Sequence, residues 1–118
     1  MSIALKRAYE QPASGDGYRV LVDRIWPRGI SKDKSDIDEW LKGAAPSDEL
    51  RKSFHKGAIS WAEFRNRYLS ELKFHRDELQ RIAQLSRNKP VTLIFSSQDK
   101  EHNNAVVLKQ YLKMLGAN

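Results

Sequence analysis

The chain contains no cysteine, so disulfide bonds, thiolate metal sites and a cysteine nucleophile are all excluded. No apolar run approaches the length that a membrane-spanning helix needs. The first residues also lack the apolar core of a signal peptide. With 118 residues, the chain is long enough to bury an apolar core without stabilisation by disulfide bonds or a bound metal. We therefore expect a single domain over residues 1–118, a cytoplasmic location and no membrane partner.

Acidic side chains are in the minority: 15 Asp and Glu stand against 21 Lys and Arg, which gives a net charge of +6. Such a balance favours anionic partners, such as phosphorylated metabolites or nucleic acid. The basic residues are also dispersed among acids, as on an ordinary solvated surface. A glycine-rich phosphate loop, a nucleophile elbow and a zinc-type histidine spacing are all absent from the sequence. The motifs therefore imply no cofactor and no bound metal.

Three apolar segments, at residues 3–9, 18–25 and 91–95, predict strands. The second and third are apolar over several consecutive positions, which is typical of strands buried on both faces. Between them, residues 61–86 carry apolar side chains every three or four positions, as a long helix would. A helix that connects two strands favours their parallel pairing. We expect an α/β fold: a small, largely parallel sheet with helices packed against it.

Two serines mark the starts of helices in the middle of the chain. Ser47 precedes two acids, and Ser60 precedes Glu63 at the spacing of a capping box. Residues 30–45 are harder to place and predict either a short helix or an anchored loop. A last helix is expected directly after residues 96–99, which form a small polar loop.

Charged and polar side chains follow the second and third strands, where each strand ends. Because the carboxyl ends of parallel strands lie at one edge of a sheet, these side chains should share a crevice with the start of the last helix. Arginines and the free N–H groups of a helix start both bind anions. The candidate ligand-binding residues are Asp23, Arg24, Trp26, Arg28, Ser96, Ser97, Asp99 and Asn103. The predicted ligand is small, anionic and phosphate-bearing.

Five of these residues also have a purely structural interpretation. Arg24 can simply pair with a buried acid, and Arg28 can be exposed in a turn. Trp26 can pack in the core rather than stack on a base or sugar. Ser97 or Asp99 can do no more than cap the last helix.

The segment Gly-Tyr-Arg-Val-Leu-Val-Asp-Arg-Ile-Trp-Pro-Arg-Gly at residues 17–29 resembles the signature of the YeaO-like bacterial proteins, the domain of unknown function 488. The likeness continues at Trp40, at residues 45–51, along the long helix, and at residues 91–93 and 103–105. It covers about residues 3 to 115. This resemblance implies a small, cytoplasmic, uncharacterised bacterial α/β protein and carries no established reaction.

Two departures from the family pattern concern chemistry. Asn104 stands where the family usually has a histidine, between an asparagine and an alanine. More distant members carry a cysteine near the third strand, where this chain has Ser96 and Ser97. The resemblance therefore provides neither a histidine proton carrier nor a thiol, so anion binding is better supported than catalysis.

Two other functions remain open at this point. A nucleic-acid-binding or regulatory protein would use the basic side of the long helix, although acids lie on that side too. A protein-interaction domain without chemistry would use tryptophan-rich surface, although core packing explains the three tryptophans equally well. The sequence does not decide the oligomeric state.

Overall fold

A four-stranded parallel sheet forms the centre of the computed structural model, which describes residues 3–118. The strands are β1 (Ile3–Arg7), β2 (Tyr18–Leu21), β3 (Glu39–Trp40) and β4 (Val91–Phe95). Their order in the sheet is β1-β4-β2-β3, and each neighbouring pair is parallel. The expected α/β class with a small parallel sheet is confirmed.

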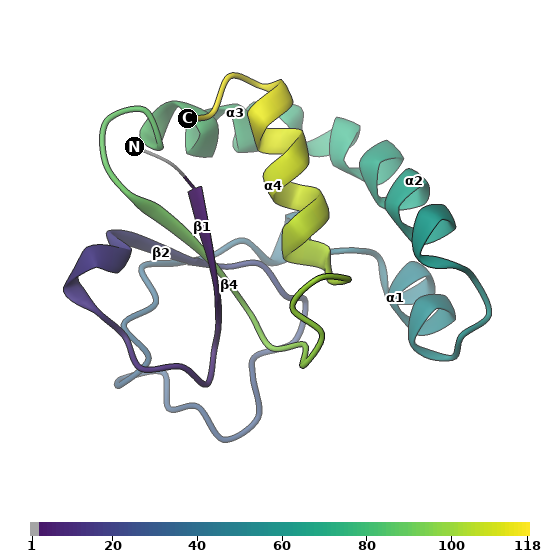
Figure 1. Ribbon diagram of the computed structural model, residues 1–118, viewed down its shortest axis with the longest axis horizontal. Coiled ribbons are helices and arrows are strands. Elements are labelled where there is room, and N and C mark those ends of the chain that lie inside the picture. The colour runs from purple at the N-terminus through teal and green to yellow at the C-terminus, as the bar shows by residue number, and fades with distance from the viewer. Residues whose placement is uncertain (1–2) are drawn as a thin grey trace.

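Four α-helices accompany the sheet in the described residues: α1 (Asp48–His55), α2 (Trp61–Leu72), α3 (Arg76–Leu85) and α4 (Asn104–Met114). Helix α4 contacts β4 and β1, while α2 and α3 contact α4 (Figure 1). Val91, Leu93 and Phe95 of β4 belong to the apolar core that includes residues of these helices. Within residues 3–118, no helix is both long and apolar enough to cross a membrane.

The expected starts of the two middle helices are confirmed. The Ser47 hydroxyl accepts a hydrogen bond from the Leu50 amide at 3.2 Å, and the Ser60 hydroxyl accepts one from the Glu63 amide at 3.1 Å. The Glu63 carboxylate pairs with Arg67 one turn later. Each serine therefore satisfies one of the free amides of a first helical turn.

Several expected boundaries were wrong. The first two strands end at Arg7 and Leu21, earlier than expected, although the Val22 amide still donates to the Ile94 carbonyl. Residues 30–45 form no α-helix but supply β3 and a short 3₁₀ turn, η2 (Lys42–Ala44). The long helix is interrupted by another 3₁₀ turn, η3 (Lys73–His75). The last helix begins only at Asn104, because Asn103 rather than Ser97 or Asp99 is its N-cap.

The face of the sheet that α4 does not cover carries a buried polar cluster. The Asp16 carboxylate accepts hydrogen bonds from the Arg19 guanidinium at 2.6 Å and from the Lys6 ammonium at 2.9 Å. Arg19 also donates to the carbonyls of Ser35 and Asp36, and the Thr92 hydroxyl donates to the Asp16 carbonyl. This cluster fixes the loops on that face, because each buried charge has several partners.

We expect the stability contributed by Asp16 to be lost in acid. Burial alone would raise the pKa of Asp16, but hydrogen bonds from the Ala13 amide, Lys6 and Arg19 outweigh it and lower the pKa. A lowered folded pKa gives stability that is complete above the unfolded value, near 4, and is lost as pH falls through the folded value. Urea unfolding should show wild type more stable than Asp16→Asn at pH 7, with the difference shrinking below about pH 4.

Asp77→Asn is the matched control for this measurement. Asp77 is exposed on α3, and its carboxylate has no hydrogen bond or ion pair to residues 3–118. Its replacement should leave the free energy of unfolding almost unchanged at each pH. A difference between wild type and Asp16→Asn that does not depend on pH would contradict the prediction.

Candidate functional site

A cavity of about 410 Å³ lies at the carboxyl ends of β2 and β4. Residues from the turn after β1, the loop after β2, helices α1 and α2, and the segment between β4 and α4 line it. This volume is within the usual range for small-molecule sites. Of the eight candidate residues, seven line the cavity: Asp23, Arg24, Trp26, Arg28, Ser96, Ser97 and Asn103.

Asp23 holds the two strand ends together at the base of this cavity. One carboxylate oxygen accepts hydrogen bonds from the Ser96 amide at 2.9 Å and the Ser96 hydroxyl at 2.6 Å. The other accepts one from the Asn104 side-chain amide at 3.0 Å. Asn104 also donates to the Val22 carbonyl, so the start of α4 is tied to the end of β2. Asp23 is therefore a structural acceptor that joins the end of β4 and the start of α4 to the end of β2.

Arg24 has a mainly structural place. Its guanidinium donates to the Pro46 carbonyl at 2.9 Å and to the Ala45 carbonyl at 3.3 Å, just before α1. A carboxylate oxygen of Asp48 lies 3.9 Å away, at the exposed start of that helix. Arg24 thus links the loop after β2 to α1, and it still brings a positive charge to the cavity wall.

Arg28 is the arginine that is free to meet a ligand. It is exposed, it lines the cavity, and its guanidinium has no hydrogen bond to the described residues. Its backbone is held, because the Tyr9 hydroxyl donates to the Arg28 carbonyl at 3.0 Å. The turn is therefore anchored while the charged group stays available.

Trp26 is fixed by its neighbours. Its indole N–H donates to the Ile30 carbonyl at 2.7 Å, and its ring meets the Trp40 ring edge-on at 5.4 Å. The Lys32 ammonium lies over the same ring at 5.5 Å. Since these groups already occupy much of the indole, Trp26 is a wall of the cavity more than an open stacking platform.

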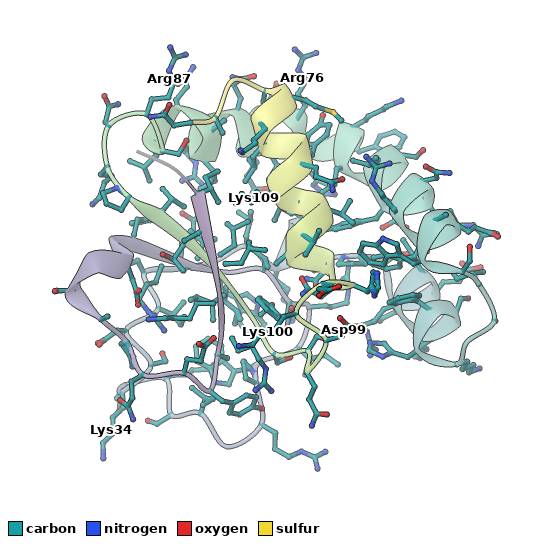
Figure 2. The ribbon with its side chains drawn as sticks, in the orientation of Figure 1. Lys34, Arg76, Arg87, Asp99, Lys100 and Lys109 are labelled. Atoms are coloured by element: carbon teal, nitrogen blue, oxygen red, sulfur yellow. The ribbon has the colours of Figure 1, made fainter. Side chains whose placement is uncertain are left out.

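The segment between β4 and α4 differs most from the ligand site that the sequence predicts. Asp99 does not line the cavity, and hydrogen bonds from the His102 and Glu101 amides lower its pKa. Figure 2 shows it in this segment near the start of α4. The Asn103 side chain accepts from the Val106 amide and donates to the Asp99 carbonyl. One amide of the helix start is thus already occupied, which reduces what α4 can offer a ligand.

Helix α1 supplies cavity residues that the sequence reasoning missed: Arg51, Phe54 and His55. Within residues 3–118, the buried Arg51 Nε atom has no hydrogen-bond partner, and the guanidinium makes a 3.4 Å contact with Asp48. The helix is held in place because the Ser47 amide and hydroxyl both donate to the Glu71 carboxylate of α2. Arg51 and His55 are one turn apart, so their spacing could have indicated a shared helix face.

Positive charge dominates the cavity lining. Among the described residues, three arginines line it, Arg24, Arg28 and Arg51, against the single carboxylate of Asp23. Asp48 approaches two of these arginines from outside, but its side chain is 61% exposed, so water screens it. Among residues 3–118, no group of three or more His, Cys, Asp or Glu side chains could hold a metal ion. The lining groups are thus suited to an anion.

Comparisons with known proteins agree with the sequence signature. The model of a family described as the inactive DUF488-N3 subclade matches residues 2–116. The chain belongs to this family. It is 45% identical to the uncharacterized protein YeaO of Escherichia coli, over 98% of this chain and all of that protein. Uncharacterized proteins of Mycobacterium tuberculosis and Mycobacterium bovis are 38% identical to it, over 93% of this chain and 92% of theirs.

No solved structure matches this chain. The family assignment confirms the YeaO-like resemblance, and the relatives carry no assigned biochemical role. The relatives therefore bring no established reaction to this chain, and the cavity is the feature that points to a function.

Proposed function

We propose that this protein binds a small phosphate-bearing anion in the cavity at the carboxyl ends of β2 and β4. The observation that carries the proposal is the convergence of three arginines on one cavity that contains a single carboxylate. That carboxylate, on Asp23, already accepts hydrogen bonds from Ser96 and Asn104. Its charge is therefore partly offset within the protein, and the arginine charges dominate.

Arg28 and Arg51 are the two groups that would hold the anion. Arg28 lines the cavity and its guanidinium has no hydrogen bond to the described residues, and the Arg51 Nε atom is buried without one. A buried donor without a partner destabilises the folded state by about 1–3 kcal/mol. Because the Nε atom itself is closed to solvent, a bound phosphate would meet Arg51 through the rest of its side chain, which is 30% exposed, and guanidinium groups match phosphate geometry well.

Binding without turnover is the form of this proposal that the residues support. The matching family is described as inactive. The chain has no cysteine, and the Asn104 amide is engaged by the Val22 carbonyl and Asp23. The Ser96 hydroxyl donates to a carboxylate that also binds two other donors, so this pair serves to join β4 to β2.

Replacing Arg28 should weaken anion binding with little effect on stability. We expect Arg28→Gln to raise the Kd for ribose 5-phosphate roughly tenfold or more, since a charge-assisted hydrogen bond to phosphate is lost. Arg51→Gln should have a similar effect. Isothermal titration calorimetry in a phosphate-free, low-salt buffer measures both variants against wild type.

Arg76→Gln is the matched control for charge. Arg76 begins α3 and points outward at the opposite end of α4 from Asp99 (Figure 2). Its replacement removes the same charge from the protein and should leave the Kd unchanged. Equal weakening by Arg76→Gln would show a nonspecific charge effect, and no detectable binding of phosphate or ribose 5-phosphate to wild type would sink the proposal.

The other proposed functions remain predictions. The basic side chains expected on one long helix are divided by η3, and Arg67 is paired with Glu63, which disfavours a continuous nucleic-acid-binding face. Among large apolar side chains, Phe74 is 89% exposed, which is the observation that favours a protein partner. Salt-dependent nucleic-acid binding and light scattering would test these two alternatives. The cytoplasmic location is likewise still a prediction.

A further inference from the structure

Aromatic rings form one wall of the same cavity. Phe54 of α1 and Phe64 of α2 both line it, and their rings are stacked with centroids 4.5 Å apart and an angle of 26°. The Trp61 ring stacks on Phe64 at 5.6 Å, and His102, which also lines the cavity, lies 5.0 Å from Trp61. Phe64 is buried, whereas Phe54 is only partly buried. Phe54 is thus the ring of this wall that a ligand can reach.

The ring and the arginine lie side by side on α1. Phe54 follows Arg51 by three residues, and side chains at this spacing are neighbours on a helix surface. A ligand that contacts both must carry a flat group and an anionic group a few bonds apart. Trp26 also lines the cavity and contacts Trp40 and Lys32, much as Phe54 contacts Phe64 and Trp61. The position of Phe54 beside Arg51 therefore decides between the two rings.

The charge of the lining matches a phosphate monoester. Three guanidiniums outnumber the Asp23 carboxylate by two, and a phosphate monoester carries about −1.5 to −2 at pH 7. Resting on the proposed function, we infer that the ligand is a nucleoside 5′-monophosphate. Its phosphate binds Arg28 and Arg51, and its base lies against Phe54.

The experiment compares three ligands that differ by one part each: inorganic phosphate, ribose 5-phosphate and adenosine 5′-monophosphate. Calorimetry should show the nucleotide binding roughly tenfold tighter than ribose 5-phosphate, because a base stacked on an aromatic side chain adds affinity of that order. Phe54→Leu should remove this advantage, so that the ratio of the Kd for ribose 5-phosphate to the Kd for the nucleotide falls close to one. Phe74→Leu is the control, since Phe74 lies in η3 and does not line the cavity.

The possible results separate this inference from the proposed function. If ribose 5-phosphate binds as tightly as the nucleotide, or if Phe54→Leu keeps the advantage of the nucleotide, the inference is wrong and the anion site stands. If none of the three ligands binds, both fail. Should Phe54→Leu not fold, saturation-transfer NMR on wild type gives the answer: transfer from protein aromatic protons to the base protons supports the inference, and its absence overturns it.

Discussion

Replacing Gly17 by alanine should destabilise the protein by about 3 kcal/mol or more. Gly17 has φ 67° and ψ −132°, a conformation that residues with a side chain rarely adopt. An added Cβ would lie 2.2 Å from the Pro90 carbonyl oxygen. That oxygen accepts the Tyr18 amide at 2.9 Å, so relieving the clash would pull apart the starts of β2 and β4. Urea unfolding followed by circular dichroism measures the loss.

Gly15→Ala is the matched control two residues away. Beyond the neighbouring residues of its own turn, a Cβ on Gly15 would have no heavy atom of the described residues within 4 Å, and the φ of Gly15 is not positive. Gly15→Ala should therefore change the free energy of unfolding by less than about 1 kcal/mol. Similar stabilities for the two alanine variants would contradict the explanation by backbone conformation and close approach.

The elements with strong local signals were predictable from the sequence. The continuous apolar run of β4 was placed at residues 91–95, and both serine caps were identified, because burial on two faces and capping leave local patterns. The two-residue strand β3 was missed. Its pairing depends on β2, through the pairs Val20–Glu39 and Leu21–Trp40, and so short a strand carries no pattern of its own.

The break at η3 was hidden by an apolar spacing that persists across it. Leu72 and Leu79 are buried on either side of the turn, so the sequence looks like one helix, while Phe74 within the turn is exposed. The second strand was extended too far for a related reason. Its apolar residues continue to Val22, but the chain then diverges to carry Asp23 towards Ser96.

The sequence predicts the position of the candidate site at the strand ends better than it predicts the contacts of its side chains. Parallel topology brought the ends of β2 and β4 together, as expected. The sequence could not show that the Arg24 guanidinium binds the carbonyls of Pro46 and Ala45, because that depends on the path of the chain before α1. For the same reason the contribution of Arg51 was missed: tertiary packing of α1 on α2 places it in the wall.

Replacing Asp23 by alanine should destabilise the protein by about 2–3 kcal/mol, because three donors from distant segments lose their acceptor. These donors are the Ser96 amide, the Ser96 hydroxyl and the Asn104 side chain. Asp99→Ala is the control. Asp99 is exposed, and its carboxylate accepts hydrogen bonds from the amides of Glu101 and His102 within its own turn. Asp99→Ala should therefore lower the free energy of unfolding by clearly less than Asp23→Ala. Equal losses in urea unfolding would contradict a joining role for Asp23.

Asp23→Asn should affect stability and anion binding in opposite directions. An amide at this position keeps one acceptor oxygen but presents N–H groups to donors of Ser96 or Asn104, so the folded state is weakened. The same change removes the single carboxylate from the cavity lining, which leaves three arginines unopposed. Ribose 5-phosphate should then bind at least as tightly as to wild type, measured by calorimetry below the unfolding temperature. Weaker binding by a folded Asp23→Asn variant would contradict the view that the carboxylate only opposes the charge of the arginines.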